Sequence, residues 1–186
     1  MRAHLILACI FILTVGCANT YPNRNPVGEM FPDVSGQSLK KESRRLPGHF
    51  HGSNVLFILG YKQDSQFDID RWLIGLDQTR TEVTAYEIPT IEGLFPRMFQ
   101  TMIDDGMRSG IPKELWGGVI TVYKDGGKVQ RFTGNEKPNN ARVVLLDKNG
   151  KVSYFYDRGF SVFALNDLRA RLAQFANKKI TSNQEE

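Results

Sequence analysis

The stretch VLFILGYKQDSQFDID, residues 55–70, opens with five consecutive apolar residues that are flanked by glycines. A short apolar run of this kind predicts a strand that is buried on both faces. Asp64 or Ser65 can then cap a helix, because their side-chain oxygens accept hydrogen bonds from free N–H groups. The following apolar residues recur at helical spacing up to Leu76. The stretch therefore predicts a buried strand followed by an amphipathic helix.

The remaining apolar segments extend this start to a mixed α/β architecture. Further strands are expected over residues 83–88, 119–123, 142–146 and 152–156, and further helices over residues 95–107 and 164–176. The first two strands should be parallel, because a helix connects them. Asp125-Gly126-Gly127 predicts a turn into residues 128–132, and Asn149-Gly150 is a strong hairpin signal. This order predicts the α/β class, with a mixed central sheet, helices on both faces, and an antiparallel hairpin and a helix at the end.

The first 16 residues have the features of an export signal. The apolar run from Leu5 to Val15 is shorter than the roughly 20 residues that a membrane-spanning helix needs. Gly16-Cys17 resembles the end of a bacterial lipobox, whose cysteine takes a diacylglycerol, although Thr14 stands where that motif usually has leucine. An ordinary secretory signal that is cleaved nearby is the alternative. We expect lipidation at Cys17.

Three segments of the chain resemble the thioredoxin superfamily. Residues 27–47 contain VGEMFP, GQSL and LP, which match the opening of its peroxiredoxin and TlpA-type branch. LLDKNGKVSYFYDRG, residues 145–159, matches the late hairpin of the family, and residues 104–112 look like an insertion of cysteine-free bacterial members. The chain is also similar to the mitochondrial ATP-synthase assembly factors. The resemblance spans residues 26–172 and implies a thioredoxin-like fold with an assembly role.

The thiols of that superfamily are missing from the mature chain. The sequence has two cysteines: Cys9 leaves with the signal, and Cys17 would carry the lipid. Asp64 and Ser65 occupy the turn where a helix N-terminus would lower a thiol pKa. We therefore expect no thiol–disulfide oxidoreductase or peroxidase activity and no cofactor. The favoured interpretation is a binding or assembly module rather than an enzyme.

These interpretations divide the chain into a lipoprotein signal peptide (1–16), a lipidated tether (17–26), a thioredoxin-like domain (27–176) and a polar tail (177–186). We expect the protein at the bacterial cell envelope, anchored by lipid. In a cell with an outer membrane it would face the periplasm from that membrane. No run of Lys or Arg exceeds a pair, which argues against a nucleic-acid partner. The expected partners are the membrane and an envelope protein or peptide.

The predicted turn after the first strand carries the main candidate site. Tyr61, Asp64, Ser65 and Asp68 can form a polar binding pocket or a partner surface. Helix capping alone explains the same residue types, because Asp and Ser are preferred at helix starts.

Two other groups of side chains are candidates for a site. His49 and His51 would face one side of an extended segment and can bind a transition metal, although two ligands do not close a site. A metallochaperone, or a non-thiol enzyme using these histidines or the Asp64/Ser65 turn, is the alternative function. Asp105 and Arg108 can bind a cation or an anion in a glycine-flanked loop, or form a structural loop.

Overall fold

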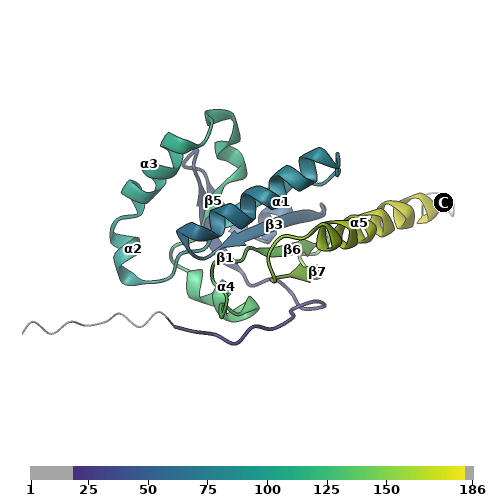
Figure 1. Cartoon of the computed structure of the whole chain (residues 1–186), viewed down its shortest axis with the longest axis horizontal. Coiled ribbons are helices and arrows are strands. Elements are labelled where there is room, and N and C mark those ends of the chain that lie inside the picture. The colour runs from purple at the N-terminus through teal and green to yellow at the C-terminus, as the bar shows by residue number, and fades with distance from the viewer. Residues whose placement is uncertain (1–18, 183–186) are drawn as a thin grey trace, which may run out of the picture.

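The computed structural model describes residues 19–182 and contains a four-stranded central sheet (Figure 1). Its strands are β3 (Val55–Gly60), β4 (Ala85–Pro89), β6 (Arg142–Leu146) and β7 (Val152–Tyr156). They lie in the order β4-β3-β6-β7, with β3 parallel to β4 and antiparallel to β6. β6 and β7 form the predicted antiparallel hairpin. The mixed sheet confirms the predicted fold class.

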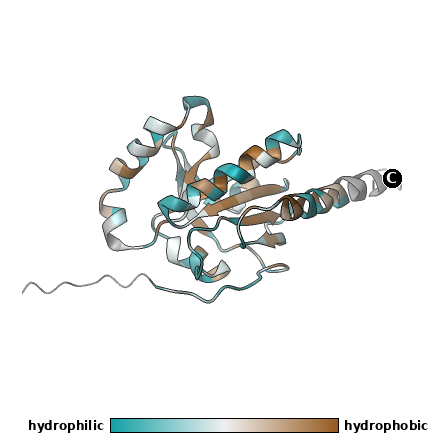
Figure 2. Cartoon of the chain, viewed as in Figure 1, coloured by the Kyte–Doolittle hydropathy of each residue, from teal (hydrophilic) through white to brown (hydrophobic). Residues whose placement is uncertain are grey.

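The central sheet is covered on both faces, which explains why β3 is apolar throughout. Successive side chains of a strand point to opposite faces. Leu56 and Ile58 pack with α1 (Gln66–Gln78) and α5 (Val162–Ser182) on one side. Phe57 packs on the other side with α4 (Gly126–Thr133) and with a small second sheet. That sheet has the order β2-β1-β5 and consists of β1 (Val34–Ser38), β2 (Ser43–Leu46) and β5 (Ile120–Thr121). Figure 2 shows hydrophobic residues concentrated in the central strands.

The structure corrects the prediction for residues 125–132. These residues were expected to form a turn and a strand, and they form the start and most of α4. Gly126 lies so close to the chain before α2 that a Cβ atom on it would be 2.5 Å from the Ile91 carbonyl oxygen. Gly126 therefore allows the start of α4 to pack directly against Ile91, and it does not form a hairpin turn. Val129 on the same helix is fully buried in the core.

Three further element boundaries differ from the predictions. The expected strand over residues 119–123 is reduced to β5, with isolated parallel bridges from Val119 to Glu87 and from Val122 to Thr90. The expected single helix is divided into α2 (Leu94–Met98) and α3 (Gln100–Gly110), and a 3-10 segment, η3 (Lys113–Gly118), follows. α5 continues to Ser182, so the part of the predicted polar tail that the structure describes is helical.

Among residues 19–182, no helix combines the length and the apolar character that a membrane span requires. The predicted signal peptide and Cys17 lie outside the described residues.

Candidate functional site

The turn between β3 and α1 holds its polar residues in structural positions. Residues 63–65 form a 3-10 turn, η2 (Gln63–Ser65). Ser65 is 1% exposed, and its hydroxyl donates a hydrogen bond of 2.6 Å to the Lys62 carbonyl oxygen. Ser65 occupies the N-cap of α1, but its side chain makes no capping hydrogen bond, so the predicted capping by this side chain is wrong. Asp64 is exposed to solvent.

Asp68 points inward and joins three segments of the chain. Its Oδ2 accepts a hydrogen bond of 2.8 Å from the Ala141 N–H, and its Oδ1 accepts one of 2.6 Å from the Phe160 N–H. The side chain lies on α1, Ala141 precedes β6, and Phe160 follows β7. The carboxylate therefore fastens the loops beside the turn.

A buried cation–π pair lies beneath the turn. The Arg142 guanidinium carbon lies 4.8 Å from the centre of the Tyr61 ring, and its Nη1 donates to the carbonyl oxygens of Lys137 (2.6 Å) and Asn140 (2.7 Å). The Tyr61 hydroxyl shares a hydrogen bond with the Thr133 hydroxyl. Burial raises the pKa of Tyr61 to about 12 and lowers the pKa of Arg142. The Tyr61 hydroxyl therefore stays protonated at neutral pH.

Glu87 is a titratable group that the sequence analysis missed. It lies on β4, is 7% exposed, and is 3.5 Å from the Gln66 amide nitrogen. Burial raises the pKa of Glu87 above its ordinary value. A single acidic residue inside an apolar strand was the available signal, as was Arg142 at the start of β6.

The two histidines do not lie on an extended segment, contrary to the prediction. Gly48–Phe50 forms a 3-10 turn, η1, and both histidines are exposed. The His49 ring packs edge-on against Phe50, with the ring centroids 4.8 Å apart. In the part of the chain that the structure describes, no three His, Cys, Asp or Glu side chains come together as a metal site.

Asp105 and Arg108 lie on α3 and not in a loop. Arg108 donates from Nη1 to Asp105 (2.6 Å) and from Nε to the Leu39 carbonyl oxygen (2.8 Å). Its guanidinium also lies 5.8 Å from the Trp116 ring centre. Arg108 therefore attaches α3 to the chain after β1, which leaves its cationic group engaged within the protein.

Residues 19–24, which we call the N-terminal strap, pack against the loop between α4 and β6. Tyr21 and Asn135 exchange two hydrogen bonds, from the Tyr21 N–H to Asn135 Oδ1 (2.7 Å) and from the Asn135 N–H to the Tyr21 carbonyl oxygen (2.9 Å). Asn135 Nδ2 also donates to the Asn19 carbonyl oxygen (2.8 Å). Gly134 has φ +78°, and a Cβ atom on it would lie 2.3 Å from Asn23 Cα. This part of the predicted tether is thus fixed to the domain.

The strap also connects the buried core to a surface hollow. Asn23 Oδ1 accepts a hydrogen bond of 3.4 Å from Arg142 Nη2. At the other end of the strap, the Asn19 amide (3.0 Å) and the Tyr21 hydroxyl (3.1 Å) both donate to Glu92 Oε1.

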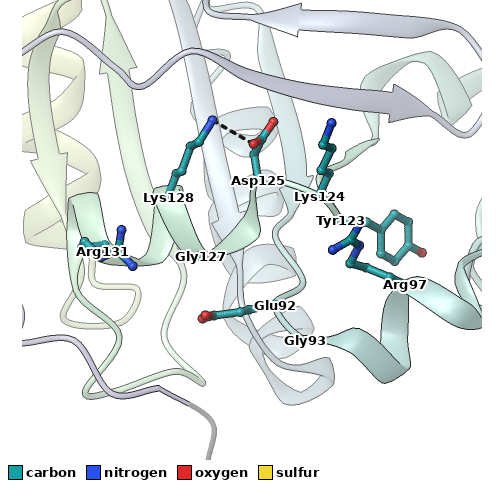
Figure 3. Close-up of a pocket in the computed structure, with 9 residues that line it drawn as sticks. All are labelled: Glu92, Gly93, Arg97, Tyr123, Lys124, Asp125, Gly127, Lys128 and Arg131. Atoms are coloured by element: carbon teal, nitrogen blue, oxygen red, sulfur yellow. Dashed lines mark ion pairs between the residues drawn. The ribbon is translucent and has the colours of Figure 1, made fainter.

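Glu92 lines an open hollow of about 370 Å³, shown in Figure 3. We call this hollow the basic depression, because four of its lining side chains are cationic: Arg97, Lys124, Lys128 and Arg131. These residues come from α2, α4 and the loop before α4, so no contiguous motif marks the depression in the sequence.

Comparisons with known proteins identify the fold. No protein-family model and no curated protein sequence matches the chain. Among solved structures, the chain is similar to yeast Sco1 with copper bound (9% identity, TM-score 0.55, 81% of this chain and 95% of that chain). It is also similar to a thiol peroxidase from Chromobacterium violaceum (14% identity, TM-score 0.51, 87% and 93%). A third similar structure is the thioredoxin domain of a thiol-disulfide oxidoreductase from Bacteroides vulgatus (19% identity, TM-score 0.50, 82% and 99%). The strand order β4-β3-β6-β7 and these similarities establish that the chain has the thioredoxin-like fold.

Proposed function

We propose that the protein is a redox-inactive binding or assembly module, tethered to a membrane of the bacterial cell envelope by lipid on Cys17. The observation that supports this most is the turn between β3 and α1. Ser65 is buried there with its hydroxyl bonded to Lys62, and residues 18–186 contain no cysteine. Because thiol–disulfide exchange requires a thiolate nucleophile, the turn cannot perform it.

Exposed apolar side chains beside the turn offer a surface for the partner. Phe67 on α1 is 73% exposed, and Val162 and Phe163 at the start of α5 are 66% and 80% exposed. Asp68 holds the first turn of α1 to Phe160, just before α5. Aromatic side chains contribute large contact areas to protein interfaces. This surface is therefore our candidate for binding an envelope protein or peptide.

The proposed tether follows from the Gly16-Cys17 motif at the end of the short apolar run. Two or more acyl chains hold a protein stably on a membrane, whereas one chain gives only marginal binding.

A photo-crosslinking experiment tests the proposed binding surface. A benzoylphenylalanine residue replaces Phe67 or Phe163 in the full-length protein in cells, and Lys148, in the exposed turn between β6 and β7, serves as the matched control. We expect one envelope protein, identified by mass spectrometry, to be captured at positions 67 and 163 but not at 148. The yield at position 67 should fall when Phe163 is changed to Asp. Equal yields at all three positions contradict the proposal.

The redox part of the proposal has a separate assay. Insulin reduction and peroxide consumption by the mature protein should match the rate without protein. A rate above that blank that survives Cys17→Ser would show a chemistry independent of thiols and would reject a redox-inactive module.

A further inference from the structure

We propose that the basic depression and the α2–α3 segment form a membrane-facing surface that binds the headgroups of anionic phospholipids. This inference rests on the proposed lipid attachment at Cys17, and it goes beyond that proposal by assigning one face of the domain to the membrane.

The first argument is the short distance between the lipid and the depression. Asn19 is hydrogen-bonded to Glu92 and to Asn135. Cys17 precedes Asn19 by two residues, and two extended residues span about 7 Å at most. A lipid on Cys17 would therefore begin within about 7 Å of a residue that contacts the wall of the depression. A free tether over residues 17–26 would permit every orientation of the domain, whereas the fixed strap does not.

The second argument is the charge of the depression. Lys128 forms an ion pair of 2.9 Å with Asp125, drawn as a dashed line in Figure 3, and Glu92 accepts its two hydrogen bonds from the strap. Within residues 19–182, Arg97, Lys124 and Arg131 form no ion pair, and all three are exposed. Unpaired Lys and Arg side chains at the membrane surface are attracted to anionic headgroups. The depression thus carries four cations against the two carboxylates of Glu92 and Asp125, next to the proposed lipid site.

The third argument is the exposed apolar side of the neighbouring segment. Met98, Phe99 and Met102 are 69%, 47% and 66% exposed, and they closely follow Arg97. The opposite side of α3 is fixed to the domain, because the buried Asp104 accepts a hydrogen bond of 2.8 Å from the Tyr123 hydroxyl. Apolar side chains next to cations are typical of segments that lie in the membrane interface. Figure 1 shows the first described residues at the end of the molecule where α2 and α4 lie.

A label on α3 tests this orientation. Residues 18–186 contain no cysteine, so Met102→Cys in the lipidated protein gives a single labelling position for an environment-sensitive fluorophore. Ile74→Cys on α1, 54% exposed, is the matched control. The protein is reconstituted into vesicles of phosphatidylcholine with or without phosphatidylglycerol. We expect quencher-bearing lipids to quench the label at position 102 in the anionic vesicles only, and to leave the label at position 74 unaffected.

Charge-reversal variants test whether the cations of the basic depression cause the quenching at position 102. Arg97→Glu with Lys124→Glu should remove more than half of the quenching at position 102. Arg71→Glu with Lys148→Glu, which changes two exposed cations elsewhere, should leave it unchanged.

The outcomes separate this inference from the proposed tether. A protein that does not float with vesicles of either composition lacks the tether, and both proposals fail. A protein that floats while the label at position 102 stays unquenched in both compositions overturns the membrane-facing surface and leaves the tether standing. Shielding of position 102 in native membranes but not in vesicles also overturns it, because a protein partner then covers α3.

Discussion

The carboxylate of Asp68 is 8% exposed and serves two backbone N–H groups, those of Ala141 and Phe160. Asp68→Ala leaves both donors without an acceptor, and each buried unsatisfied group costs about 1–3 kcal/mol. We expect the variant to lose about 2–4 kcal/mol of unfolding free energy in urea titrations. Asp70→Ala, at an exposed position bonded to Gln66, should lose less than about 0.5 kcal/mol. Similar losses in both variants would show that Asp68 does not fasten the loops.

The buried hydroxyl of Tyr61 should make the unfolding free energy depend on pH in the alkaline range. Its pKa is raised to about 12 from an ordinary value of 10.0. Below pH 10 the hydroxyl is neutral in both states, and its contribution is fully present. Between pH 10 and 12 the unfolded chain loses this proton first, so stability falls as pH rises. This fall amounts to about 2–3 kcal/mol, since one pKa unit corresponds to about 1.4 kcal/mol.

Tyr61→Phe isolates that contribution from the other buried tyrosines. Burial also raises the pKa of Tyr123 and Tyr154, so part of the alkaline loss belongs to them. We expect the unfolding free energy of the variant, measured by urea titration across this range, to fall less steeply than that of the wild type. Parallel curves would mean that Tyr61 does not titrate between these pH values.

Local sequence patterns predicted the helices and strands that depend on neighbouring residues, and they failed where contacts between distant parts of the chain determine the structure. β3 and the β6–β7 hairpin were predictable, because an apolar run and Asn149-Gly150 carry their information locally. α4 was not, because Asp125-Gly126-Gly127 has the residue types of a hairpin turn, and only the approach of Ile91 explains Gly126. The strap has no local signal at all: Tyr21 and its partner Asn135 are 114 residues apart in the sequence.

The same reasoning separates the predictable from the unpredictable parts of the site. The missing thiol and the polar turn were visible in the sequence, and so was the isolated charge of Arg142 at the start of β6. The inward direction of Asp68 was not, since the two N–H groups that donate to it lie in two other loops. The basic depression could not be predicted either, because folding brings together cations from α2, α4 and the loop between β5 and α4.

A single methyl group should release the strap. Gly134→Ala places a Cβ atom 2.3 Å from Asn23 Cα in a residue with φ +78°, so the strap must move away. We expect trypsin to cleave after the exposed Arg24 at least about tenfold faster, because proteolysis tracks the population of the open segment. Mass spectrometry identifies the new N-terminus at Asn25. Gly48→Ala, with no atom within 4 Å of the added Cβ, is the control, and equal cleavage of both variants contradicts the fixed strap.

For the whole molecule, the strap changes what a lipid anchor does. An anchor on a free tether fixes only the distance of a domain from the membrane. Here Asn19 is already bound to the domain, so the anchor would also fix its orientation. The exposed Phe67 and Phe163 lie on α1 and α5, whereas the basic depression is lined by residues of α2, α4 and the segments before these helices. The two candidate surfaces consist of different residues, so lipid contact and partner binding can be tested by separate substitutions.

Removal of the lipid acceptor, Cys17, tests whether the lipid holds the protein on the membrane. The native chain is compared with a Cys17→Ser variant in which a signal peptide that is cleaved without a cysteine replaces residues 1–16. We expect the membrane-bound fraction to fall at least about tenfold in high salt, because each buried methylene contributes about 0.8 kcal/mol and tenfold needs only about 1.4 kcal/mol. At low salt, part of the variant should stay bound to anionic membranes through Arg97 and Lys124, since salt screens such contacts. Membrane fractionation of the processed proteins and palmitate labelling measure both effects. A processed Cys17→Ser variant that remains bound after a high-salt wash would contradict anchoring through Cys17.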